Sequence, residues 1–182
     1  MKTVALFGGS FDPPHIGHVS IVEALEMLSF IDSIVVMPTY LNPFKSTFVA
    51  PASLRLQWLK KIFSTHHKVE VSSFEVSMNR SVSTMESVEF LKKSYDKIYV
   101  VIGADNLASL PKWHHYETLK DMVTFIVASR NNIPIDENYI ALPIQEDITS
   151  SSLRISMQPS KIPQQCATEI QNYYKEYNAN KN

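Results

Sequence analysis

Short apolar runs alternate along the chain with segments in which apolar residues recur at helical spacing. Residues 3–7, 97–102 and 122–128 are runs typical of strands that are buried on both faces. Further extended segments are expected at residues 35–37 and 69–76. Helices are expected at residues 19–28, 53–63, 83–94 and 114–120, and in a last helix whose packed face carries Cys166, Ile170, Tyr173, Tyr174 and Tyr177. The alternation predicts an α/β fold, a Rossmann-like parallel sheet with helices on both faces.

The composition is that of an ordinary globular protein. The chain has 182 residues, 45% of them hydrophobic and 19% charged, so we expect a single domain over 1–182 with a loose tail at 178–182. The single cysteine, Cys166, excludes an internal disulfide. No apolar run is long enough for a membrane span or a secretion signal, and the net charge of −1 gives no broad footprint for nucleic acid. We therefore expect a cytoplasmic protein that binds neither nucleic acid nor membrane.

The segment from Gly8 to His18 is the most informative part of the chain. It reads GGSFDPPHIGH and lies between the first expected strand and the first expected helix. A helix N-terminus at the carboxyl end of a parallel strand offers unpaired N–H groups and the positive end of the helix dipole to an anion. The segment therefore predicts a phosphate site, although neither GxGxxG nor GxxxxGK[ST] is present.

Two histidines in this segment are placed to act together. His15 and His18 are three residues apart, so they share a face of the first helical turn, and Gly17 leaves room for a close approach. A pair of incidental surface histidines is one alternative. A half-built zinc site is another, but zinc needs three or four ligands and no Cys or acidic cluster completes one nearby.

A second candidate element lies near the carboxyl terminus. Residues 148–154 read ITSSSLR, a run of hydroxyl side chains followed by Arg154. Hydroxyl residues at a helix start can cap the helix and donate to phosphate, and an arginine one turn later can add a two-pronged contact. By itself the run is equally typical of a plain helix cap with a surface arginine.

These motifs resemble those of a known family. The HxGH pattern, with GGSFDP before it, resembles the signature of the nucleotidyltransferases, and ITSSSLR resembles the ISSTxxR element that accompanies it. Residues 101–107, followed by Trp113 and Tyr116, are similar to the IGxDxL…W…YE block of bacterial nicotinate-nucleotide adenylyltransferases. Residues 38–45 are similar to the PxxxPPHK loop of these enzymes, and Thr84 with Ser87 to their SYTxxT segment. The resemblance covers most of residues 1–158, with departures at Asn42, Phe44 and Ser83, where the family usually has Pro, His and Tyr.

The resemblance implies an enzyme that transfers the adenylyl group of ATP to nicotinate mononucleotide, giving deamido-NAD and pyrophosphate in NAD biosynthesis. Mg²⁺ is expected mainly on the ATP phosphates. The residues implied in catalysis are His15, His18 and Arg154. Those implied in ATP binding are Gly8, Gly9, Ser10, Phe11, Lys45, Asp105, Arg130, Ser150 and Ser151. Those implied in acceptor binding are Thr84, Trp113 and Tyr116.

The residues themselves leave alternatives open. Trp113 follows a buried strand, where an indole is either a core plug or a platform for a cationic pyridine ring. One rival function is another HxGH adenylyltransferase, with phosphopantetheine or nicotinamide mononucleotide as the acceptor. The other is a noncatalytic nucleotide-sensing module on the same fold. The sequence leaves the oligomeric state open, with a homodimer among the options.

Overall fold

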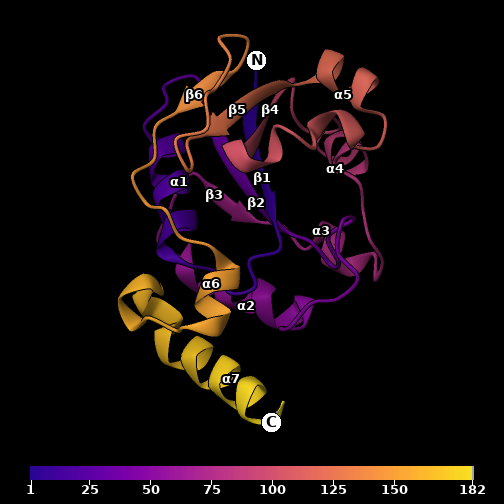
Figure 1. The fold of residues 1–182 in the computed structure, drawn as a ribbon. Helices are drawn as coiled ribbons and strands as arrows, with labels where there is room; N and C mark the ends of the chain where they lie inside the picture. Colours follow the sequence, from indigo (N-terminus) through magenta and orange to yellow (C-terminus); the bar gives the residue numbers. More distant parts are fainter. Residues whose placement is uncertain (182) are drawn as a thin grey trace.

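A six-stranded parallel sheet forms the centre of the molecule (Figure 1). The structure is a computed structural model, and residues 1–181 are described. The strands are β1 (Thr3–Gly9), β2 (Ser33–Pro38), β3 (Val69–Val71), β4 (Lys97–Gly103), β5 (Thr124–Ala128) and β6 (Ile140–Leu142). Their order is β3-β2-β1-β4-β5-β6, and each neighbouring pair is parallel. The predicted Rossmann-like fold class is confirmed.

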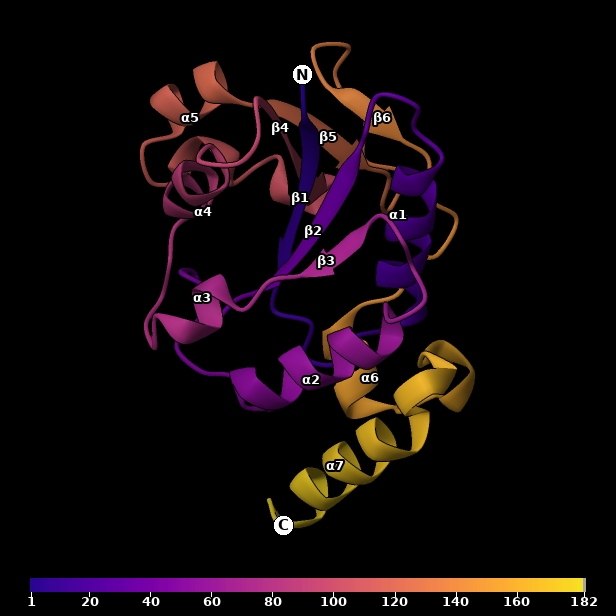
Figure 2. The ribbon, with the colours of Figure 1, turned by 180° about the vertical axis from the view of Figure 1, so that it is seen from behind.

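Helices cover both faces of the sheet (Figures 1 and 2). They are α1 (Ile16–Glu26), α2 (Ala52–Ile62), α3 (Phe74–Ser77), α4 (Thr84–Leu91), α5 (Tyr116–Met122), α6 (Ser150–Ile155) and α7 (Ala167–Ala179). One core joins the sheet to α1, α2 and α7, and the other joins it to α4 and α5. In the described part of the chain, none of these helices has the length and apolar character needed to cross a membrane.

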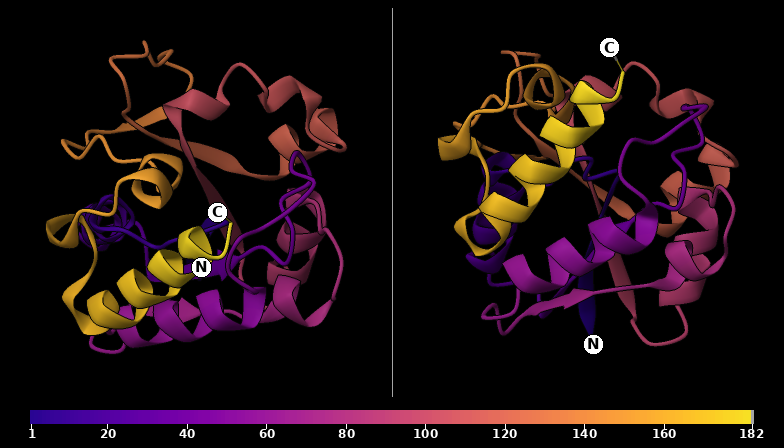
Figure 3. Two further views of the ribbon diagram at one scale, coloured as in Figure 1. Left: turned by 60° about the horizontal axis from the view of Figure 1, so that its bottom comes forward. Right: turned by 90° about the horizontal axis from the view of Figure 1, so that it is seen from below.

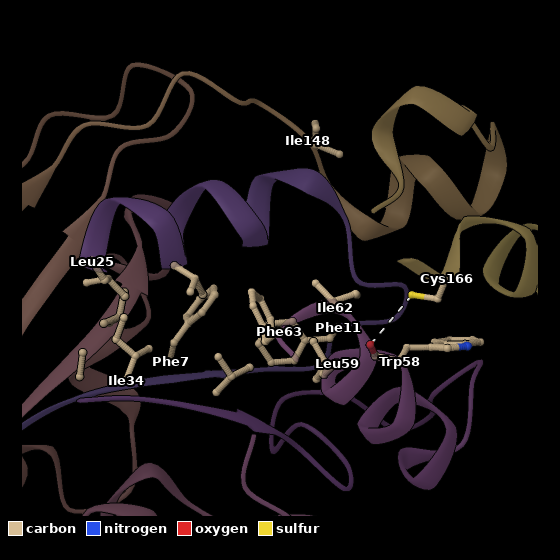
Figure 4. Packing of buried hydrophobic residues seen from close by; sticks show 14 of the residues in the cluster. Phe7, Phe11, Leu25, Ile34, Trp58, Leu59, Ile62, Phe63, Ile148 and Cys166 are labelled. Carbon is tan, nitrogen blue, oxygen red and sulfur yellow. Dashed lines mark hydrogen bonds between the residues drawn. The ribbon is translucent and has the colours of Figure 1, made fainter. Parts of the chain in front are cut away.

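Alternate residues of the central strands supply the two cores. On β1, Ala5 and Phe7 enter the core under α1 and α2, whereas Val4 and Leu6 enter the core under α4 and α5. Successive side chains of a strand point to opposite faces, so a strand covered on both sides reads as a continuous apolar run. Figure 4 shows part of the first core, with Phe7 among its labelled side chains.

Several expected boundaries are wrong. The extended segment expected over 69–76 stops at Val71, because Phe74 N–H donates to Ser72 Oγ at 3.2 Å and α3 follows. The short edge strand β6 and helix α3 were not predicted. The strand expected from Met122 begins at Thr124, since Met122 is the last residue of α5.

The tail expected at 178–182 is also partly wrong. Helix α7 continues to Ala179, and Asn178 Nδ2 donates to the Arg154 carbonyl at 2.8 Å. That bond ties the end of the helix to α6. Residue 182 lies outside the described residues.

The strand order creates a crevice beside β1. The chain leaves β1 toward β2 on one side, and β4 lies on its other side, so connections diverge from the carboxyl ends of β1 and β4. Open α/β sheets bind ligands at such a switch point. The segment Gly8–Gly9 ends β1 and Gly103 ends β4, so the glycine turn noted in the sequence opens onto this crevice.

Helix α7 packs beside α2 (Figure 3). The Trp58 ring lies 5.7 Å from Tyr173 and 6.1 Å from Tyr174, measured between centroids. Tyr174 is fully buried, and its hydroxyl donates to Asp12 Oδ1. The expected core packing of the tyrosine stripe holds for Tyr174, whereas Tyr177 lies partly exposed beneath the Lys181 ammonium, 4.9 Å from its ring centre.

We predict that Tyr174→Phe lowers the free energy of unfolding by about 1–3 kcal/mol, because the buried Asp12 oxygen loses a donor. Urea unfolding followed by circular dichroism measures the change. Tyr177→Phe is the matched control and should shift stability by no more than about 0.5 kcal/mol. Equal losses in the two variants would show that the Asp12 contact has no special weight.

Candidate active site

A cleft of two adjoining lobes lies at the carboxyl ends of β1 and β4. The larger lobe has a volume of about 550 Å³ and the smaller about 320 Å³, and Ser10, Lys45 and Ser151 line both. The sequence-predicted residues in the wall of the larger lobe are Gly8, Gly9, Ser10, Phe11, His15, His18, Lys45, Thr84, Asp105, Trp113, Arg130, Ser150 and Ser151. Arg154 lines the smaller lobe. Segments far apart in the sequence thus converge on one space.

His15 and His18 stack on each other at the start of α1. Their ring centroids are 3.6 Å apart, and the His15 backbone N–H donates to His18 Nδ1 at 3.1 Å. That bond requires Nδ1 of His18 to be an acceptor, so a neutral His18 carries its proton on Nε2. A Cβ on Gly17 would lie only 3.0 Å from His15 Nδ1. The glycine of HxGH therefore makes room for the His15 ring.

Both histidines are uncharged at neutral pH. Burial, followed by the nearby Arg130 charge, lowers the pKa of His15 from 6.5 to about 3. Burial also lowers the pKa of His18, with further contributions from His15 and Arg130. The pair therefore presents neutral N–H donors, and His15 Nδ1 is buried without a hydrogen-bond partner among the described residues.

The loop before α1 is held by the buried carboxylate of Asp12. Its Oδ2 accepts from Val49 N–H at 2.7 Å, and its Oδ1 accepts from Ala50 N–H at 2.9 Å and from the Tyr174 hydroxyl. Phe11, just before it, is buried with φ of 50°, in the left-handed region. Asp12 therefore fixes a sharp turn against two distant segments.

Arg55 is the second fixed point and was not identified from the sequence. Its guanidinium is buried in α2 and donates only to carbonyls, to Ala50 at 2.9 Å, to Tyr40 at 3.0 Å and to Ser10. The available signal was its position, because residue 55 lies one turn before the apolar stripe of α2. A charged residue on an apolar helical face needs buried partners.

The smaller lobe is cationic. Lys45 Nζ lies 3.4 Å from Ser10 Oγ, and Arg154 donates to the Asp12 carbonyl and, at 3.2 Å, to Ser151 Oγ. Burial and the Arg154 charge lower the pKa of Lys45. The Asp12 carboxylate is already hydrogen-bonded to Val49, Ala50 and Tyr174. Lys45 and Arg154 are therefore free to bind a multiply charged anion together.

Helix α6 begins as predicted, but its serine side chains make different contacts. Thr149 Oγ1 accepts from Ser152 N–H at 2.9 Å and caps the helix. Ser150 Oγ donates to the Pro13 carbonyl at 2.8 Å, so its hydroxyl fastens α6 to the loop before α1. Ser151 and Arg154 remain directed at the smaller lobe.

Asp105 and Arg130 lie at the ends of β4 and β5. Arg130 Nη2 donates to the Ile148 carbonyl at 2.8 Å, and its Nε lies 3.9 Å from Asp105 Oδ2. A Cβ on Gly103 would come within 2.5 Å of the Asp105 carboxylate. The glycine therefore lets Asp105 fold back against the strand end.

Of the three residues expected to bind the acceptor, Thr84 and Trp113 line the larger lobe and Tyr116 does not. Trp113 lines the larger lobe, and its Nε1 is buried without a hydrogen-bond partner among the described residues. Thr84 also lines it, at the first turn of α4, which Ser83 caps by accepting from Glu86 N–H at 3.3 Å. Tyr116, however, is not part of the described cavity wall and packs against the Phe125 ring at 6.4 Å. Its position at the start of α5, past the turn at His115, directs it to the core.

Glu75 is a further wall residue that the sequence did not reveal. It lies on α3, only 5% exposed, and accepts from Ser87 Oγ at 2.7 Å. Burial, with a smaller effect from Glu86, raises its pKa from 4.5 to about 7. Because residues 69–76 were expected to be extended, no reading of the sequence placed this carboxyl at the cleft.

The fold and the cleft together define a class. A doubly wound sheet with a paired-histidine HxGH turn at the switch point, and a cationic lobe beside it, is the architecture of a nucleotidyltransferase. The cytidylyltransferase-like family model matches residues 6–156.

Comparison with known proteins narrows the class. Proteins named nicotinate-nucleotide adenylyltransferase from Sulfurimonas denitrificans and Nitratiruptor sp. are 56% and 46% identical to the chain, covering 97% and 94% of it and 97% and 98% of their own lengths. A nicotinic acid mononucleotide adenylyltransferase from Plasmodium falciparum, solved in complex with NaAD, superposes with a TM-score of 0.80 at 21% identity, covering 98% of both chains. The chain belongs to the nicotinate-nucleotide adenylyltransferase family.

We predict that the depressed pKa of His15 makes the protein less stable in acid. Between about pH 3 and 6.5 the unfolded chain binds a proton at His15 that the folded chain does not, so stability falls as pH falls. His15→Asn should reduce the slope of unfolding free energy against pH there by up to about 1.4 kcal/mol per pH unit. Urea titrations at several pH values measure it. The exposed His67 offers the control His67→Asn, and identical slopes for His15→Asn and the native protein would refute the prediction.

Proposed function

We propose that the chain catalyses adenylyl transfer from ATP to nicotinate mononucleotide, forming deamido-NAD and pyrophosphate, with the cleft residues in the roles below. The observation that carries this proposal is the neutral histidine pair beside a separate cationic lobe, which matches the charge pattern of a nucleoside triphosphate. The family supplies the acceptor, because the relatives are named for nicotinate nucleotide. The Plasmodium falciparum neighbours, solved with NaAD and with APC, are consistent with a nucleotide site in this fold.

The chemical step needs no protein nucleophile. An oxygen of the acceptor phosphate attacks the α-phosphorus of ATP as the bond from that phosphorus to the bridging oxygen breaks, and pyrophosphate leaves in line. Such transfers ask the protein for positioning and for stabilisation of charge on the moving oxygens. His18 Nε2–H and the His15 ring donate to the α-phosphate oxygens from fixed positions, with no cost of reorganisation.

The cationic lobe receives the leaving group. Lys45 and Arg154 bind the β- and γ-phosphates, assisted by the Ser151 hydroxyl, and the glycine turn lets the backbone of residues 8–11 approach the nucleotide. Burial and the Arg154 charge lower the pKa of Lys45, which is expected to rise when phosphate binds. Binding the product pyrophosphate through the same groups stabilises the separating charge.

The two ends of the larger lobe serve the two organic groups. Asp105 and Arg130 contact the adenosine. Trp113 offers an aromatic face to the pyridinium ring of the acceptor, a contact worth roughly 1–3 kcal/mol for a stacked base. Thr84 and the backbone around it donate to the ring substituent.

A divalent cation, Mg²⁺, enters as part of the substrate MgATP. Among residues 1–181 no group of three His, Cys, Asp or Glu side chains forms a metal site, and the phosphate lobe is cationic. The ion would therefore be held through phosphate oxygens, where it neutralises charge on the triphosphate.

The decisive experiment measures pyrophosphate release with ATP and each of nicotinate mononucleotide, nicotinamide mononucleotide and phosphopantetheine. Release with the first acceptor in large excess over the others supports the proposal. Faster release with phosphopantetheine would assign a different adenylyltransferase, and ATP binding without release would indicate a nucleotide sensor. A cytoplasmic location, a single domain and the homodimer option remain predictions.

We predict that His18→Ala lowers kcat by about 10²–10³, as does the loss of one preorganised donor elsewhere, while the fold remains intact. Steady-state pyrophosphate release and a circular dichroism spectrum measure the two properties. His114→Ala, a change of an exposed histidine at the cleft rim, is the comparison variant. An unchanged kcat in His18→Ala would remove His18 from the mechanism.

We predict that Trp113→Ala raises the KM for nicotinate mononucleotide about tenfold to a hundredfold and the KM for ATP far less, because only the acceptor loses its stacking face. Two substrate titrations at saturating partner measure the pair of constants. Equal increases in both constants would indicate structural damage to the β4–α5 segment and contradict the role.

A further inference from the structure

Residues of α3 and α4 form one wall of the larger lobe. Glu75 and Ser87 face each other there, beside Thr84. Glu75 is only 5% exposed. Its Oε1 accepts a hydrogen bond from Ser87 Oγ, whereas its Oε2 has no hydrogen-bond partner among the described residues. A buried polar atom left unpaired at the wall of a binding cavity indicates that a ligand completes it.

We propose that Glu75 is a specificity-determining residue for the acceptor: its protonated carboxyl donates to the ring carboxylate of nicotinate mononucleotide, whereas its ionised form favours a carboxamide ring. The inference rests on the proposed function, because it needs the pyridine ring to lie between Trp113 and Thr84. It adds a named side chain to an acceptor end that otherwise offers the Thr84 hydroxyl and backbone N–H groups.

The chemistry of the two acceptors supports the assignment. The acid presents only acceptor oxygens, and two carboxylates in contact share a single proton, which here resides on Glu75. The amide presents an N–H₂ group, which an ionised carboxylate accepts. The pKa of about 7 makes both forms of Glu75 accessible near neutral pH.

The charges around Glu75 do not compete for this role. On α4, Glu86 is paired with Arg80 at 2.6 Å, which lowers its pKa to about 2, so it stays ionised. On α2, Arg55 is bound to backbone carbonyls, and Lys60 and Lys61 are exposed. Strand β2 and the remainder of α3 carry no titratable side chain. The other titratable or charged side chains that line the larger lobe are His15, His18, Lys45, Asp105, His114 and Arg130.

The test compares kcat/KM for nicotinate mononucleotide with kcat/KM for nicotinamide mononucleotide between about pH 6 and 8.5. Groups that act on both acceptors alike, including the acceptor phosphate and the histidine pair, cancel in the ratio of the two constants. If protonated Glu75 binds the acid and ionised Glu75 binds the amide, the ratio of kcat/KM for the acid to kcat/KM for the amide should fall by up to about tenfold for each unit by which the pH rises. A ratio that does not change with pH would overturn the proposal.

Variants assign the effect to Glu75. Glu75→Gln keeps the shape and an oxygen for Ser87 but does not titrate, so its ratio should be independent of pH. Glu89→Gln changes an exposed carboxylate on α4, and His114→Gln changes the titratable neighbour at the rim; both variants should keep the native slope. A slope that survives in Glu75→Gln, or disappears in His114→Gln, contradicts the proposal.

Ser87→Ala tests the role of Glu75 independently. The Ser87 hydroxyl stabilises the ionised carboxylate of Glu75, so removal of the hydroxyl should raise the pKa of Glu75. The acid-to-amide ratio of kcat/KM should then increase at every pH. This variant decides the matter if Glu75→Gln does not fold. A shift toward the amide would refute the assignment.

Proton uptake separates this proposal from the proposed function. Calorimetric titrations of the native protein at about pH 8, in two buffers of different ionisation enthalpy, should show more protons taken up with nicotinate mononucleotide than with nicotinamide mononucleotide. Equal uptake overturns the role of Glu75. Absence of pyrophosphate release with either acceptor would instead refute the proposed function, while the difference in uptake would still report on Glu75.

Discussion

The structure of the site depends on one buried carboxylate, that of Asp12. It binds the segment at residues 49–50 through two backbone N–H groups and the last helix through the Tyr174 hydroxyl. A charge removed from water is costly unless it is fully hydrogen-bonded, so this arrangement is stable only when all three segments are in place. The conformation of the turn that contains Asp12 therefore depends on the packing of α7 and of the loop before α2.

Around this anchor, the two lobes of the cleft differ in the charge of the side chains that line them. The histidine pair at the turn is neutral because it is buried, whereas the adjoining lobe is lined by the basic side chains of Lys45 and Arg154. Neutral donors can approach a phosphate closely without binding substrate much more tightly than the transition state. In the proposed reaction the basic side chains bind the leaving pyrophosphate, so each lobe suits one part of the triphosphate.

Local features of the site could be predicted from the sequence, and features that join distant segments could not. The strand, glycine turn and helix around His15 are contiguous, so periodicity and turn chemistry place them. The bond from Tyr174 to Asp12 spans 162 positions in the sequence, and no local pattern encodes it. Residue 75 was misplaced because a four-residue helix is too short to show a helical period. Tyr116 was assigned to the acceptor through the family resemblance alone, and a sequence motif does not say which way a side chain turns after the left-handed residue His115.

The loop at residues 40–50 is fixed at both ends by one buried side chain, that of Arg55. Arg55 holds the carbonyls of Tyr40 and Ala50, so both ends of the segment are fixed through the main chain. Between these ends, Asn42 Oδ1 accepts a hydrogen bond from Phe44 N–H at 2.9 Å. This side-chain bond stabilises a turn there, as a proline does by restricting φ. Phe44 itself is 61% exposed. Residues inside the loop can therefore be exchanged without loss of the two bonds that fix its ends, so the path of the loop along the smaller lobe does not depend on one particular sequence.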